Sequence, residues 1–106
     1  MMDAEKMFDS LEVAIVGSDA DMNVIYANEK GRKMGNLVGK NLTAFHKPET
    51  IGVIEGLFKA FRNKEKKIDY YKTDTPNGKI TVIQFPFYEN DEFAGVVEFI
   101  VESALD

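Results

Sequence analysis

The residues that could carry chemistry in this chain of 106 residues are few and scattered. There is no Cys, which excludes thiolate catalysis, disulfides and Cys-ligated metal sites within these residues. Most acidic side chains fall in segments that look like turns and helix ends, where they are solvated and titrate normally. Because no nucleophile is accompanied by a general base, the sequence predicts a binding or interaction module rather than an enzyme.

The one His of the chain, His46, is the side chain best suited to ligate iron. It immediately precedes the segment that begins at Pro48, which we expect to open a helix. A His at a helix start can equally bond to the nearby backbone, and we favour this alternative. Asp19 and Asp21 lack the further oxygen ligands of a calcium loop, so we expect a turn there and no metal site.

The elements that must position these side chains follow from hydrophobic periodicity. A helix is expected to start near Pro48, because apolar side chains repeat at helical spacing from Ile51 to Phe61 and basic residues from Arg62 to Lys67 gather near its C-terminal end. From residue 68 onward the period changes to two, with a strong hairpin signal at Asn77-Gly78. Segregated strands and helices predict an α+β domain with an antiparallel sheet covered by helices on one face. The expected segments are an amphipathic helix over 2–11 and strands over 13–16, 24–27, 68–75, 79–88 and 93–102.

Charge and hydropathy exclude two classes of partner. The net charge of −5 disfavours nucleic acid, whose phosphates must be met by Lys and Arg. No apolar run approaches the length needed to span a membrane, and the N-terminus lacks the apolar core of a signal peptide. We therefore expect a soluble, cytoplasmic protein.

Four segments in order resemble the PAS domain, over approximately residues 11–102. They are Val24-Ile25-Tyr26-Ala27-Asn28, Val38-Gly39-Lys40-Asn41-Leu42, Phe85-Pro86 and Gly95-Val96-Val97-Glu98. The chain is also similar to PAS domains found beside hemerythrin-like domains, through His46-Lys47-Pro48-Glu49-Thr50. Lys47 departs from the first Pro of that H-P-P-x-S motif.

The resemblance implies a five-stranded antiparallel sheet, in the order 2-1-5-4-3, with helices enclosing a pocket on one face. PAS domains bind haem, flavin or small metabolites there, or act as ligand-free dimerisation modules. Haem with His46 as axial ligand is one alternative, whereas flavin adduct chemistry is excluded because it needs a Cys. We expect a short N-terminal helix over 1–11 and a single domain over 12–103. No output domain is expected, so we expect a signalling partner in trans or a second copy of this chain.

If Pro86 and Gly95 occupy the same strand positions as in PAS domains, the side chain of Gln84 points toward the helices and the apolar interior. An unpaired buried amide costs about 1–3 kcal/mol, so Gln84 needs a partner. A ligand carbonyl or carboxylate is one partner; Tyr26, Tyr70 or a backbone group is the alternative we favour. The full set of predicted pocket residues is Tyr26, Met34, Leu42, Phe45, His46, Ile54, Leu57, Phe58, Tyr70, Val82, Gln84, Val97 and Phe99.

The opposite face of the predicted sheet is apolar, and an exposed apolar face usually marks an interface. We therefore predict a homodimer through this face, with the N-terminal helix covering part of it. The candidate interface residues are Met7, Phe8, Leu11, Ile83, Phe85, Phe87, Val96 and Ile100. Two functions remain in competition: a module that binds a small-molecule ligand, and a ligand-free module that dimerises or docks.

Overall fold

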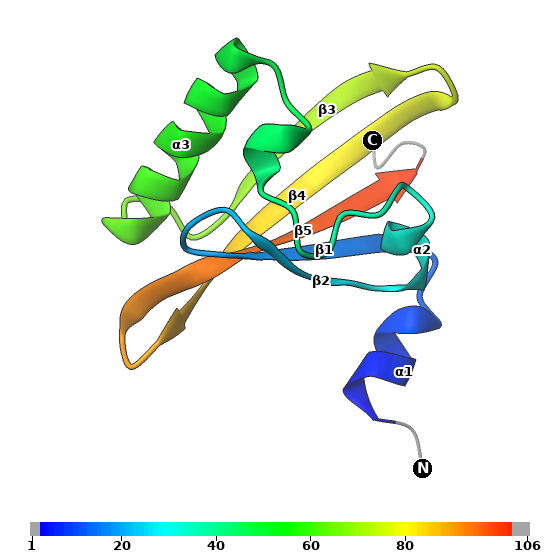
Figure 1. The fold of residues 1–106 in the computed structure, drawn as a ribbon, viewed down its shortest axis with the longest axis horizontal. Coiled ribbons are helices and arrows are strands. Elements are labelled where there is room, and N and C mark those ends of the chain that lie inside the picture. The colour runs from blue at the N-terminus through cyan, green and yellow to red at the C-terminus, as the bar shows by residue number, and fades with distance from the viewer. Residues whose placement is uncertain (1–2, 103–106) are drawn as a thin grey trace.

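The computed structural model describes residues 3–102, which form one antiparallel sheet with helices packed on it (Figure 1). The strands lie in the order β2-β1-β5-β4-β3, and α3 runs across one face of the sheet. The predicted fold class and strand order are therefore confirmed. The elements are α1 (Ala4–Asp9), β1 (Ala14–Asp19), β2 (Val24–Ala27), α2 (Glu29–Arg32), the 3-10 helix η1 (Leu42–Ala44), α3 (Pro48–Arg62), β3 (Asp69–Thr75), β4 (Gly78–Glu89) and β5 (Glu92–Glu102).

The long helix α3 begins at Pro48, as the sequence predicts, and ends at Arg62, so Lys64, Lys66 and Lys67 lie beyond it and not at its C-terminal end. Pro48 occupies the first turn, where its missing N–H costs nothing, and Lys47 before it is extended. Phe58 and Phe61 are buried, and they pack with Met22 and Val96 in the core between helix and sheet. Among the described residues, no helix has the length and apolar character needed to cross a bilayer.

A fully buried Asn28 joins the N-terminal segment to the sheet. Its Oδ1 accepts hydrogen bonds from the backbone N–H of Ile15 at 2.8 Å and of Gly31 at 2.9 Å. Its Nδ2 donates to the carbonyl oxygens of Phe8 and Val13, both at 2.8 Å. All the hydrogen-bonding capacity of this amide is thereby used at the junction of α1, β1 and α2.

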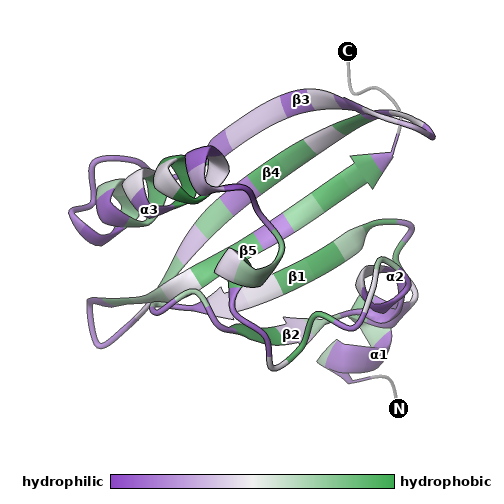
Figure 2. Ribbon diagram, turned by 45° about the horizontal axis from the view of Figure 1, so that its top comes forward, coloured by the Kyte–Doolittle hydropathy of each residue, from purple (hydrophilic) through white to green (hydrophobic). Residues whose placement is uncertain are grey.

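The central strands of the sheet are apolar, whereas the edge strand β3 is largely hydrophilic (Figure 2). The hairpin between β4 and β5 turns through Asn90 and Asp91, with φ of 51° and 66°. Such a pair of left-handed residues makes the tight two-residue turn that suits the twist of a hairpin. Tyr88 pairs with Phe93 next to this turn.

One step further along the hairpin, Phe87 pairs with Gly95, so Ala94 is an extra residue in β5. A single extra residue moves every later side chain of the strand to the other face of the sheet. The predicted faces of β5 are therefore wrong. Val97 and Phe99 lie opposite Phe85 and Ile83, away from α3.

The same bulge brings Val96 and Ile100 to the side of the sheet that α3 covers. Val96 is only 3% exposed and belongs to the core, and Ile100 lies opposite Val82. Neither residue lies on the outer face, so both are removed from the predicted dimer interface. Val97 and Phe99 replace them there, and the ring of Phe99 packs at 5.8 Å from that of Phe85.

Candidate functional site

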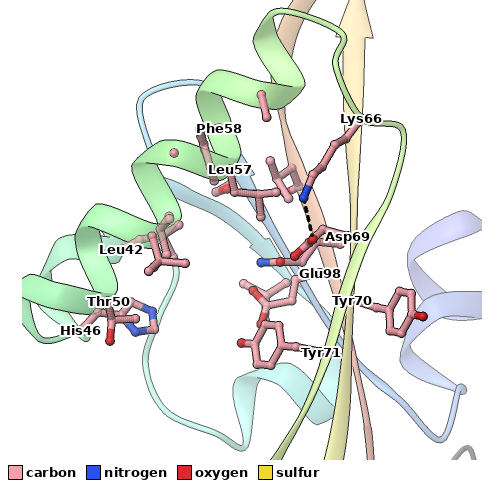
Figure 3. Close-up of a pocket in the computed structure, with 18 of the residues that line it drawn as sticks. Leu42, His46, Thr50, Leu57, Phe58, Lys66, Asp69, Tyr70, Tyr71 and Glu98 are labelled. Atoms are coloured by element: carbon pink, nitrogen blue, oxygen red, sulfur yellow. Dashed lines mark hydrogen bonds and ion pairs between the residues drawn. The ribbon is translucent and has the colours of Figure 1, made fainter.

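A cavity of about 720 Å³ lies between α3 and the sheet (Figure 3). One wall is apolar and comes from Leu42 of η1 together with Ile54, Leu57 and Phe58 of α3. Its volume falls within the range of small-molecule sites, about 300–1,000 Å³. Because α3 must bury its apolar stripe against the sheet, the helix both forms the core at one end and roofs this cavity at the other.

Near the centre of the sheet side, Gln84 of β4 and Glu98 of β5 form a polar pair that lines the cavity. They are directly opposite in the strand register and therefore project from the same face. Burial raises the pKa of Glu98 above its ordinary value, while a hydrogen bond from the Gln84 side chain acts in the opposite direction. A carboxylate with an amide beside it is thus held at the bottom of a largely apolar cavity.

Two further side chains of β3 stand beside this pair. Tyr71 lies close to Glu98 (Figure 3). The pKa of its phenol is raised, mainly by burial and to a smaller extent by the carboxylates of Glu98 and Asp69. The Asp69 carboxylate forms an ion pair of 3.3 Å with Lys66, which closes the cavity near the end of α3. The hydroxyl of Tyr71 and the Glu98 carboxylate together make this part of the cavity rich in hydrogen-bond acceptors.

The start of α3 forms the opposite edge of the cavity. His46 and Thr50 project from it toward the space in front of Tyr71 (Figure 3), and Glu49 lines the same edge. His46 is exposed. Among the described residues there is no cluster of His and acidic side chains that would hold a metal ion.

About half of the predicted pocket residues do line this cavity. They are Leu42, His46, Ile54, Leu57, Phe58, Tyr70 and Gln84. Tyr70 belongs to the edge only, because it lies opposite Ile83 and its ring points away from the cavity (Figure 3). Its neighbour Tyr71 is the tyrosine that faces the helix side, so Tyr70 is not the partner of Gln84, whose side chain bonds to Glu98.

The other predicted residues lie elsewhere. Val97 and Phe99 are on the outer face because of the bulge at Ala94. Met34 and Phe45 are exposed in the segment between α2 and α3, and Val82 is buried without reaching the cavity.

Tyr26, the remaining predicted pocket residue, also lies outside the cavity. It pairs with Gly17, which in turn pairs with Val97, so its ring belongs to the outer face. There it packs edge to face against Phe8 of α1, at 6.3 Å. The Tyr26 hydroxyl is buried and has no hydrogen-bond partner among the described residues. Gln84 therefore cannot bond to it.

Sequence reasoning missed Glu98, Tyr71, Asp69 and Lys66. A signal for Glu98 was present, since it is the one charged residue among the apolar residues 93–101. An acid in the middle of a central strand is unusual unless it is paired or functional.

A sequence model of the PAS domain family matches residues 4–103. No curated protein matches the chain. Among solved structures, a C-terminal domain from Streptococcus mutans is 19% identical, with a TM-score of 0.77 over 92% of this chain and 81% of that one. The PAS domain of a protein from Colwellia psychrerythraea is 20% identical, with a TM-score of 0.66 over 90% and 89%.

A third similar structure is a sensory box sensor histidine kinase from Vibrio cholerae, which is 16% identical. Its TM-score is 0.69, over 93% of this chain and 85% of that one. These likenesses show the shared fold, and the family match covers nearly the whole of the described structure. The chain belongs to the PAS domain family.

Proposed function

We propose that this PAS domain is a sensory module that holds a small molecule in the cavity beneath α3 and signals through contacts with another protein. PAS domains are typically sensory or signalling modules, which supports the general class. The observation that carries the proposal is the Gln84–Glu98 pair at the bottom of the cavity. A few polar groups in an apolar cavity are the usual composition of a ligand site.

The alternative is a ligand-free module that acts by dimerisation. PAS domains commonly dimerise in signalling proteins. Exposed apolar side chains support this alternative. Phe85 on the outer face of the sheet is 36% exposed, Met7 of α1 46% and Leu11 just after α1 42%. The proposed interface is now Met7, Phe8, Leu11, Ile83, Phe85, Phe87, Val97 and Phe99. In this proposal the N-terminal segment of residues 1–11, which contains α1, acts as an interface element beside the domain of residues 12–103.

Haem is a poorer fit to this cavity than a smaller ligand. The lining includes the acids Glu49, Asp69 and Glu98, which would repel haem propionates. Lys66, the lining cation that could meet a propionate, is already paired with Asp69. The function of His46 as an axial ligand stays a prediction, as do the link to hemerythrin-associated PAS domains, the absence of catalysis and the cytoplasmic location.

Native mass spectrometry of the freshly purified protein tests the main proposal. We expect a mass above that of the 11.9 kDa chain, which returns to the chain mass after denaturation. The test variant is Gly56→Leu, which places a larger side chain at a cavity-lining position of α3. It should lower the fraction of the protein that retains the additional mass. Purified protein without any retained or exchangeable small molecule would favour the ligand-free alternative.

A further inference from the structure

The polar end of the cavity has an excess of acid over available base. Glu98, Asp69 and Glu49 line it, against the basic residues Lys66 and His46. The Lys66 ammonium lies 3.3 Å from Asp69, so its charge is already met. Within residues 3–102, no Lys, Arg or His forms an ion pair with Glu98.

A carboxylate in an apolar cavity is costly when no cation accompanies it. Glu98 is held there by strand pairing, since it lies opposite Gln84 on one side and Val16 on the other. The strand cannot rotate it to the outer face without moving its neighbours there as well. The position of Glu98 is therefore built into the sheet, and its charge is left for a ligand to meet.

The groups around Glu98 favour a ligand that donates hydrogen bonds. The Glu98 carboxylate oxygens, which share one hydrogen bond from the Gln84 amide, and the carbonyl oxygen of Gln84 only accept, and the hydroxyl of Tyr71 can accept as well as donate. Charge-assisted bonds from an ammonium group to a carboxylate are stronger than bonds between neutral groups. Leu42, Leu57 and the remaining apolar wall offer contact to a hydrocarbon body.

We infer that the cavity takes an organic cation, a protonated amine on an apolar body, with the nitrogen against Glu98 and Gln84 and the body against the underside of α3. This inference rests on the proposed function, that the cavity binds a small molecule. It excludes organic anions as the preferred class, because a ligand carboxylate would face the Glu98 charge at close range. It also explains why a charged residue occupies this position in the otherwise apolar middle of the strand.

Three probes with the same hydrocarbon body test the inference: phenethylamine, phenethyl alcohol and phenylacetate. Their binding is measured by isothermal titration calorimetry and by amide chemical-shift changes, at about pH 8, where the amine is protonated and phenylacetate is ionised. We expect phenethylamine to bind at least about tenfold more tightly than phenylacetate, with the alcohol between them. Glu98→Gln should bring the amine to within about threefold of the alcohol.

Glu102→Gln is the matched control, because it removes the same charge from an exposed position on the same strand. It should leave the order of the three probes unchanged. Tightest binding of phenylacetate, or an amine preference that survives in Glu98→Gln, overturns the inference. An amine that binds no better than the alcohol also overturns it, yet leaves a ligand-binding cavity standing. Failure of all three probes overturns it too, while the retained-mass measurement still decides the proposed function.

Discussion

Gln84 and Glu98 face each other across the β4–β5 pair and project together into the cavity beneath α3. The two residues form the polar centre of the cavity floor, between apolar Val16 and Val96 and the polar side chains of Asp69 and Tyr71 on β3. Burial raises the pKa of Glu98, and Gln84 offsets part of that effect. The pair therefore links the electrostatics of the cavity to the stability of the fold.

Protein stability should reflect the titration of Glu98. Its folded pKa is raised above the ordinary value of 4.5, so the native state binds the proton more tightly than the unfolded state. The contribution of Glu98 to the free energy of unfolding is then present at low pH and lost as pH rises from about 4.5 through the raised pKa. We expect Glu98→Gln to be more stable than wild type at neutral pH, with the difference shrinking toward pH 4.

Urea unfolding of both proteins between about pH 4 and pH 8 measures this effect. The other titratable groups around the cavity are Asp69 and Tyr71 from β3, Lys66 before it, and Glu49 and His46 from the start of α3. They are present in both proteins and cancel in the difference. Glu102→Gln should show no such pH-dependent difference from wild type. Parallel pH profiles for wild type and Glu98→Gln would contradict the prediction.

The strand order of the sheet could be predicted from the sequence, but the faces of β5 could not. Both sides of this strand are apolar: Val96 and Ile100 alternate with Val97 and Phe99. A period of two therefore does not say which set faces the helix. A two-residue turn without a bulge would place Val97 opposite Gln84, and the extra residue Ala94 shifts that partner to Glu98.

The same difference between helix and strand decides which cavity residues could be predicted from the sequence. Those on α3, such as Ile54, Leu57 and Phe58, could be predicted because helical spacing defines a single apolar face. Those on strands depend on which face each strand turns inward, and β3 turns Tyr71, opposite Val82, to the helix side and Tyr70, opposite Ile83, to the other. Met34 and Phe45 lie in irregular segments, where no period restricts the direction of a side chain.

Two glycines should respond in opposite ways to the same substitution. A Cβ at Gly95 would meet the carbonyl oxygen of Ser18 and the ring of Phe87, next to the bulge that sets the register. We expect Gly95→Ala to lower stability by about 2 kcal/mol or more, because backbone and ring must both move. At Gly52 on α3 a Cβ meets nothing within 4 Å, so Gly52→Ala should raise stability by about 0.5–1 kcal/mol.

Thermal unfolding of the two variants beside wild type measures the difference. Each variant is the control of the other, since both add one methyl group to a glycine. An unchanged melting temperature for Gly95→Ala would show that β5 tolerates a side chain there. It would then contradict the close approach of β1 and β5 at this position.

Asn28 should be among the least replaceable residues outside the cavity. Asn28→Ala leaves the buried N–H groups of Ile15 and Gly31 and the carbonyls of Phe8 and Val13 without this partner. Each unsatisfied buried group costs about 1–3 kcal/mol, so we expect a loss of at least about 3 kcal/mol. Urea unfolding measures it, with Asn36→Ala at an exposed position as the control. A loss near that of the control would mean that water replaces the amide at this junction.

The outer face of the sheet should hold two copies of the domain together. Phe85 packs against Phe99 on that face and is still 36% exposed, and Phe8 covers only the region of Tyr26. An aromatic side chain left at a sheet surface gains burial when a second apolar face is laid on it. We expect a dimer at about 50 μM by size-exclusion chromatography with light scattering, because a largely apolar face of this kind suits a homodimer interface.

Phe85→Glu should convert that dimer to a monomer, because two copies of the charge would be buried in the same interface. Val38→Glu is the control, since Val38 is 46% exposed in the segment between α2 and η1 and lies off the sheet. It should leave the dimer intact, and far-ultraviolet circular dichroism of both variants checks that the fold is kept. Monomeric wild-type protein at this concentration would contradict the interface, as would a Phe85→Glu variant that still dimerises. Monomeric wild-type protein would also remove the main support for the ligand-free dimerisation alternative.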